Sequence, residues 1–260
     1  MKVVEDAQLV VKRKFPWFID IFLYPISASG IIHIVIFLVA PFLIGLVSRF
    51  ILSGIFLLGG IISLLLYLLF VGYVFFYLAY CIFDSSKGGW RAPDISIQHT
   101  PDKGDIISQL LRIFGCLAVC FWPLAVYYVF TERSDLIFWL LFAFGSFFFP
   151  MALLAGVLFD SFDALNPILI IRSIYKTFLP YCVLVPLFCV LNMLIIRVIA
   201  NLPRPKNYIQ ILNYGFVIVN YVCSRSFVYR TVAPIYLAMV AAHLLGRFYW
   251  WNKDKLDWGI

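Results

Sequence analysis

The chain has 260 residues, of which 64% are hydrophobic and only 13% are charged, and its formal net charge is +7. Soluble globular proteins have about 45–50% apolar and about 25% charged residues, so the composition excludes a water-soluble fold. The positive charge does not indicate nucleic acid, because the lysines and arginines stand at the ends of apolar runs, where they direct topology and contact lipid phosphates.

Residues 1–30 are predicted to form an amphipathic segment at the membrane interface, ahead of a single transmembrane domain over 31–260. Apolar residues recur at helical spacing up to Phe15, with charged residues on the other side, and Pro16 ends this surface helix. No short apolar core with a small-residue cleavage site is visible, so we expect the first span to direct insertion.

The expected fold class is all-α: a polytopic integral membrane helical bundle of about six transmembrane helices with amphipathic surface helices. A span needs about 20 predominantly apolar residues. The predicted spans cover 31–48, 54–83, 113–130, 136–159, 178–199 and 226–247. A second surface helix over 167–177 is predicted after Asn166 and Pro167, a capping residue followed by a proline at the first helical position.

The stretch 209–223 leaves the number of spans open. It is apolar but short, and Arg225 and Arg230 follow it, which would be costly at the bilayer centre. We expect it to lie at the surface or to re-enter partway, with a seven-span arrangement as the competitor. With six spans, thirteen basic residues fall on the side of both termini and seven on the other. The positive-inside rule then places both termini in the cytoplasm.

Catalytic and metal-binding patterns are missing from the sequence. All thirteen acidic residues lie outside the central parts of the predicted spans, which argues against ion-coupled transport and intramembrane proteolysis. The sequence has no GxSxG, HExxH, Walker A or dinucleotide-binding motif. The six cysteines form no CxxC pair. We therefore expect neither an enzyme nor a metal site.

Three sets of residues remain as candidates for a function. Small residues at four-residue spacing allow helices to approach closely, and these are Ala238, Ala242, Gly246, Ala152 and Gly156. Arginines at predicted span ends are candidates for anion or lipid contact: Arg197, Arg225 and Arg230. His33 and His243 fall at one depth in the six-span arrangement, which is a minimal condition for ligating haem b; the alternative is a hydrogen bond at a helix interface.

Several short motifs resemble a family of uncharacterised bacterial polytopic membrane proteins, a domain of unknown function. They are Tyr24-Pro25 followed by Gly30, Pro93-Asp94, Pro150-Met151-Ala152, Ala164-Leu165-Asn166-Pro167 and the run from Ala242 to Arg247. The resemblance implies a multi-span helical fold in the bacterial cytoplasmic (inner) membrane. It implies no activity and no catalytic residues.

These observations favour a non-enzymatic scaffold or accessory subunit of a larger membrane complex, with the lipid bilayer and other membrane subunits as its partners. The alternative is a transporter, channel or lipid-handling protein that uses the boundary arginines. A haem-binding electron-transfer subunit is a more remote alternative, and otherwise no cofactor is expected.

Overall fold

The structure is a computed structural model, and it describes residues 17–50, 56–94, 103–159, 166–200, 225–256 and 258. The predicted surface helix before Pro16, the ambiguous stretch 209–223 and the acidic pair Asp160 and Asp163 lie outside these residues. Every regular element in the described part is helical, which confirms the all-α fold class.

Nine helical elements follow one another along the described chain. They are α1 (Trp17–Leu23), the 3₁₀ turn η1 (Tyr24–Ile26), α2 (Ala28–Phe50), α3 (Phe56–Ser86), α4 (Lys103–Thr131), α5 (Leu136–Leu158), α6 (Pro167–Lys176), α7 (Phe178–Ala200) and α9 (Arg225–Leu256). Asn166 caps α6 through a 3.0 Å bond from the backbone N–H of Ile168, as the cap-and-proline pattern predicts.

Six of the described helices are long and apolar enough to cross a membrane. These segments are Ala28–Val47, Ile62–Ser86, Ile107–Thr131, Leu136–Leu158, Phe178–Val198 and Val232–Leu256. The described part of the chain is therefore a multi-pass integral membrane protein, as predicted.

The candidate spans differ in extent from several predicted ones, and two of the differences involve buried arginines. The third span starts near Ile107 rather than at 113, because Arg112 packs inside the bundle and does not interrupt it. The sixth continues to Leu256 rather than ending at 247, because Arg247 is buried.

The boundary predicted at residue 30 also falls inside a helix, since α2 begins at Ala28. The short segment before it belongs to the bundle. Ile21 and Tyr24 are buried, and the Tyr236 hydroxyl of α9 donates a hydrogen bond to the Phe22 carbonyl. Residues 17–30 therefore pack with the transmembrane helices rather than forming a separate unit.

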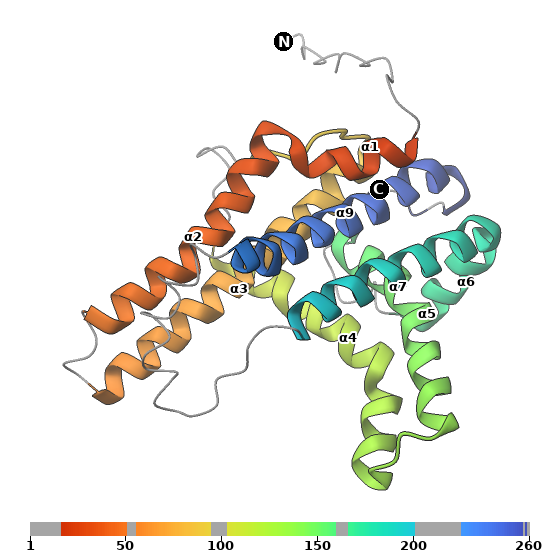
Figure 1. Ribbon diagram of the computed structural model, residues 1–260. Helices are drawn as coiled ribbons and strands as arrows, with labels where there is room; N and C mark the ends of the chain where they lie inside the picture. The colour runs from red at the N-terminus through yellow and green to blue at the C-terminus, as the bar shows by residue number, and fades with distance from the viewer. Residues whose placement is uncertain are drawn as a thin grey trace.

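Helix α9 is the centre of the bundle. In its most apolar stretch 61% of the residues are buried, against 17–22% in each of the other five spans. Figure 1 shows α9 passing between α3 on one side and α7 on the other. The remaining helices are therefore arranged around the last one in the described sequence.

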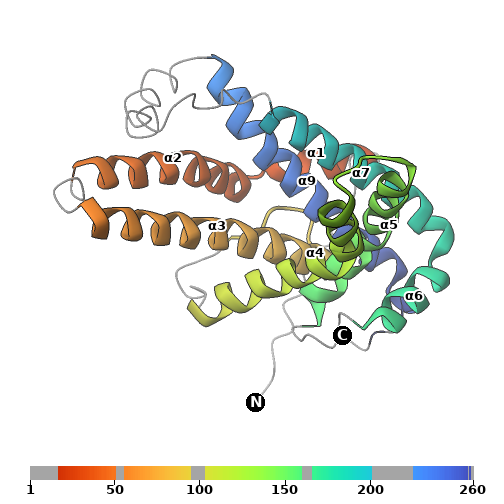
Figure 2. The same ribbon diagram turned by 90° about the horizontal axis from the view of Figure 1, so that it is seen from below.

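Burial divides the bundle into two halves. The packed half contains the buried residues and comprises 28–37 of α2, 72–86 of α3, 109–120 of α4, 145–158 of α5, 181–191 of α7 and 239–256 of α9. The splayed half comprises 38–47 of α2, 62–71 of α3, 121–131 of α4, 136–144 of α5 and 192–198 of α7, and none of these residues is buried. In Figure 1 the α2–α3 and α4–α5 hairpins diverge from each other, and Figure 2 shows α2 and α3 running side by side away from α6.

Candidate functional site

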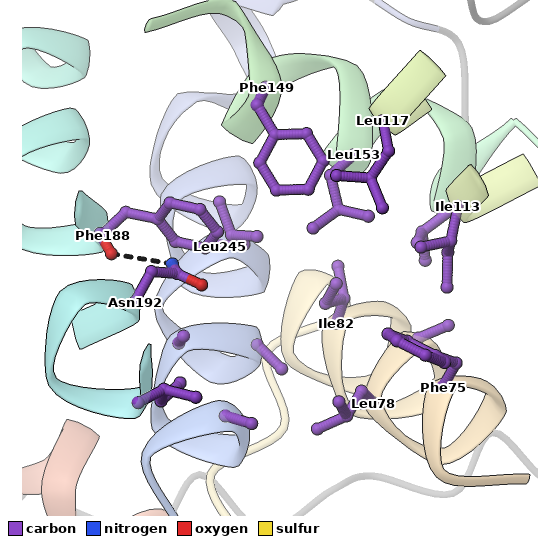
Figure 3. A pocket seen from close by; sticks show the side chains of 16 residues that line it. Phe75, Leu78, Ile82, Ile113, Leu117, Phe149, Leu153, Phe188, Asn192 and Leu245 are labelled. Atoms are coloured by element: carbon purple, nitrogen blue, oxygen red, sulfur yellow. Dashed lines mark hydrogen bonds between the residues drawn. The ribbon is translucent and has the colours of Figure 1, made fainter. Parts of the chain in front are cut away.

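An apolar cavity of about 220 Å³ lies where the packed half gives way to the splayed half (Figure 3). Five of the six spans contribute to its lining. The lining residues are Phe75, Leu78, Ala79 and Ile82 of α3, Ile113 and Leu117 of α4, Phe149, Leu153 and Val157 of α5, Phe188, Asn192 and Ile195 of α7, and Ala238, Ala241, Ala242 and Leu245 of α9.

The cavity is closed at one end and less so at the other. Ile82, Ile113 and Leu245 are buried and line its end in the packed half. Phe75 and Ile195, at the opposite end, are only half-buried. The lining therefore becomes less buried toward the splayed half.

Side-chain size explains why the helices leave this space. Ala79, Ala238, Ala241 and Ala242 present methyl groups, which are too short to fill the gap between α3, α7 and α9. An apolar cavity of about 150 Å³ in a protein core stays dry and admits benzene, so a larger one lined in this way can hold an apolar ligand.

Asn192 is the one polar side chain among the described lining residues. Its Nδ2 donates a 2.8 Å hydrogen bond to the Phe188 carbonyl one turn earlier in α7 (Figure 3). The amide is half-buried and lies among phenylalanine, isoleucine and alanine side chains. Sequence analysis did not single it out, because one asparagine in an apolar run has no periodic signal.

A second cluster of polar side chains joins η1, α2, α3 and α9 in the packed half. The His33 ring stacks on the Tyr77 ring at 3.9 Å, and the His243 ring stacks on the Tyr24 ring at the same distance. The hydroxyls of both tyrosines approach the thiol of Cys81. All five side chains are buried, so they form a continuous column across the junction.

Hydrogen bonds fix both histidines within this column. His33 Nδ1 donates to the Ser29 carbonyl at 2.8 Å, and His243 Nδ1 shares a 2.7 Å hydrogen bond with the Ser85 hydroxyl. Burial raises the pKa of Tyr24, in η1 just before the first span, so its hydroxyl stays neutral. The two histidines therefore act as polar contacts between helices.

The structure brings His33 and His243 to one end of the bundle but does not place them face to face. Tyr77, Cys81 and Tyr24 stand between their rings in the column. A bis-histidine haem needs both ring nitrogens on one iron. The haem hypothesis gains no support from this arrangement and stays a prediction, which a Soret band in the purified protein would test.

The small residues at four-residue spacing lie at contacts between helices of this chain. A Cβ atom on Gly246 would stand 2.4 Å from the Ile82 carbonyl oxygen of α3. One on Gly156 would stand 2.8 Å from the Cys116 sulfur of α4, whose thiol also donates to the Ala152 carbonyl. Ala242 and Ala238 line the cavity.

Of the three candidate arginines, the structure describes the side chain of Arg197 alone. Arg197 is exposed near the end of α7, in the splayed half. Arg225 and Arg230 lie in the first turns of α9, and their side chains are outside the described part.

Arg247, which sequence analysis treated as a boundary charge, is instead buried in an aromatic setting. Its guanidinium carbon lies 3.8 Å from the Trp90 ring centroid and 5.2 Å from that of Trp251. Arginine stacks well on indole faces, so this contact attaches the loop after α3 to the end of α9. The tryptophans that follow Arg247 in the sequence, Trp250 and Trp251, were the available signal.

No family model, curated protein or solved structure matches this chain. The resemblance to a bacterial membrane protein family therefore stays a prediction. Within the described residues, no group of three or more histidine, cysteine, aspartate or glutamate side chains is placed to hold a metal ion.

Proposed function

We propose that this membrane protein handles lipid, and that it binds an apolar lipid segment in the cavity between α3, α4, α5, α7 and α9. One observation carries the proposal: a cavity of about 220 Å³ with an apolar lining lies between the helices, and its lining is less buried toward the splayed half. An empty apolar cavity of this size forfeits packing contacts, which a bound chain would restore.

The small-residue stripes, one of the observations behind the scaffold hypothesis, contribute to contacts within this chain. Gly246 and Gly156 are occupied by contacts with α3 and α4 of the same chain, and Ala152 is fully buried. These residues consequently offer no close-approach surface to a partner subunit. A role in a larger complex stays a prediction, tested by recovery of a stoichiometric partner in mild detergent.

A binding role rather than catalysis is also part of the proposal. The Ser85–His243 hydrogen bond is the one contact that resembles a nucleophile and base among the described side chains. Both residues are buried at the α3–α9 crossing, and the His243 ring is covered by Tyr24. We assign this pair to helix packing.

We further propose that the packed half faces the cytoplasm. Among described positions, its end of the bundle holds Lys87, Arg91, Lys103, Arg112, Arg172, Lys176, Arg247, Lys253 and Lys255. The opposite end holds Arg49, Arg133, Arg197, Arg225 and Arg230. The positive-inside rule favours this orientation, and labelling of Arg91→Cys from outside the cell would contradict it. A bacterial cytoplasmic membrane follows from the resemblance alone.

Filling the cavity tests the lipid-binding proposal. Ala241→Leu adds bulk to a buried lining residue, whereas Ala143→Leu adds the same bulk at an exposed site in the splayed half. Lipid that co-purifies with each variant is extracted and quantified per mole of protein. We expect the wild type and Ala143→Leu to retain lipid, and Ala241→Leu to lose most of it.

Ala238→Leu, at the less buried end of the cavity, provides a second filled variant if Ala241→Leu fails to fold. Monodisperse elution of each variant establishes that it folds. Equal lipid retention in the filled and control variants would overturn the proposal, as would a wild type that carries no lipid after detergent exchange.

A further inference from the structure

We propose that the ligand of this cavity is a lipid alcohol whose hydroxyl group donates a hydrogen bond to Oδ1 of Asn192. This inference rests on the proposed lipid binding and specifies the chemical class of the lipid. It follows from the orientation of one amide, the polarity of the lining and the size of the cavity.

The orientation of the Asn192 amide is fixed by chemistry. The Phe188 carbonyl can only accept a hydrogen bond, so the atom 2.8 Å from it must be the Nδ2 donor. Oδ1 is then the other end of the amide, and Figure 3 shows it turned away from the Phe188 carbonyl. One of the two Nδ2 hydrogens is thus engaged by the Phe188 carbonyl, and Oδ1 faces the cavity as a hydrogen-bond acceptor.

The acceptor Oδ1 discriminates among lipid groups, whereas the second Nδ2 hydrogen of the amide could donate to a hydroxyl, ester, ether or ketone oxygen alike. A phosphate or carboxylate would bring negative charge to a carbonyl oxygen in an apolar lining, with no cationic side chain among the described lining residues. An ester, ether or ketone oxygen can only accept and would leave Oδ1 without a partner. A hydroxyl group is neutral and donates, so it matches the site.

The cavity volume limits which part of the ligand enters. About 220 Å³ exceeds the roughly 150 Å³ of an apolar cavity that admits benzene. The space holds the hydroxyl-bearing end of a lipid, either a ring or a short length of chain. The rest of the molecule extends through the less buried end, past Phe75 and Ile195, toward the splayed half.

Asn192 also explains why the hydroxyl end enters first. In hydrocarbon, a hydroxyl group without a partner is unfavourable, and so is an unpaired amide oxygen. Their hydrogen bond relieves both costs. We expect an alcohol to bind about 5- to 10-fold more tightly than the matching methyl ether, which corresponds to about 1–1.4 kcal/mol for one neutral hydrogen bond.

Photocrosslinking with two matched probes tests the inference. The probes are a diazirine-bearing dodecanol and its methyl ether, applied to the purified full-length chain in lipid nanodiscs. Half-saturating concentrations are measured from the labelling of peptides that contain cavity residues such as Phe188 and Leu245. We expect the alcohol to label these peptides at about 5- to 10-fold lower concentration than the ether.

Asn192→Leu replaces the amide with an apolar side chain of similar volume. We expect both probes to label this variant with the same half-saturating concentration. That concentration should equal the one at which the ether labels the wild type. Retained ether labelling also establishes that the variant's cavity is intact. If Asn192→Leu does not fold, the ratio of the half-saturating concentrations of alcohol and ether in the wild type still tests the preference for a hydroxyl group.

Two further results separate this inference from the proposed function. Equal labelling of cavity peptides by both probes in the wild type would overturn the lipid-alcohol inference and leave lipid binding in place. Failure of both probes to label these peptides would overturn both the inference and the proposed lipid binding. A preference for alcohol that persists in Asn192→Leu would assign the recognition to another group and overturn the role of Asn192.

Discussion

The packed and splayed halves of the bundle have the same apolar character but different helix contacts. Buried residues in the packed half include glycines, alanines, histidines and serines, whereas the splayed half exposes large side chains such as Leu64, Phe130 and Leu136. Lipid tails are as apolar as leucine, so the hydrophobic effect gives helices no reason to associate within a bilayer. Close packing therefore occurs where small and polar residues allow it, and the helices separate where these residues stop.

The cavity lies at the transition between the two halves. Helix α9 carries Gly246 at the tight crossing with α3 and alanines on the following turns toward the splayed half. Phe75, Phe149 and Phe188 hold the surrounding helices apart at that level. Small residues therefore permit close packing at one level of the bundle and leave an unfilled space next to it.

The largest expected effect comes from adding one methyl group in the packed half. In Gly246→Ala the new Cβ would stand 2.4 Å from the Ile82 carbonyl oxygen and 2.5 Å from the Ser85 Cβ, so α3 and α9 must separate. We expect the free energy of unfolding to fall by about 2–3 kcal/mol, as measured by denaturation in mixed sodium dodecyl sulfate micelles.

Gly45→Ala is the matched control in the splayed half. Its Cβ would meet only the Tyr67 hydroxyl, at the ordinary distance of 3.6 Å. Since alanine favours helix over glycine by up to about 1 kcal/mol, this variant should be neutral or slightly stabilising. An equal decrease in the free energy of unfolding in the two variants would show that the packed and splayed halves do not differ in helix packing.

A smaller effect is expected from the Ser85–His243 hydrogen bond in the packed half. Ser85→Ala removes it, and His243→Phe removes it while keeping an aromatic ring against Tyr24. A double-mutant cycle should give a coupling of about 0.6–1 kcal/mol, the size found for hydrogen bonds between membrane helices. A coupling indistinguishable from zero would show that this contact does not hold α3 and α9 together.

The smallest effect is expected at Asp135, in the exposed turn at the tip of the α4–α5 hairpin. The Tyr127 hydroxyl donates to Oδ2 at 2.6 Å and the Phe138 N–H donates to Oδ1 at 3.2 Å; these bonds lower the pKa of Asp135. Because the folded pKa is depressed, ionised Asp135 contributes to the stability of the folded state. This contribution is complete above the usual aspartate pKa of about 3.9 and is lost as pH falls through the folded pKa.

Tyr127→Phe should therefore raise the pKa of Asp135 toward its usual value, as followed by carboxyl-carbon NMR titration. Stability at neutral pH should stay close to that of the wild type, since the group is solvent-exposed. An unchanged pKa would show that the tyrosine does not stabilise the carboxylate. A large loss of stability would show that this hairpin tip is more tightly coupled to the bundle than its exposure indicates.

The spans were predictable because hydropathy is a local property. A run such as 178–199 must be helical in lipid, where backbone groups can only bond within their own segment, and α7 occupies Phe178–Ala200. The candidate spans continue past the predicted ends at Arg112 and Arg247, where the prediction assumed that charges face lipid. Both are buried, and burial depends on neighbouring helices.

The sequence by itself determined that the chain crosses the membrane and where most of its helices lie, because lipid exposure imposes helix formation segment by segment. Only the tertiary structure decided that α9 is central, that His33 and His243 stack on tyrosines, and that Asn192 lines a cavity. These properties depend on side chains from distant segments meeting at one depth. Small residues at helix crossings determine which side chains come into contact. These residues have little hydropathy signal of their own.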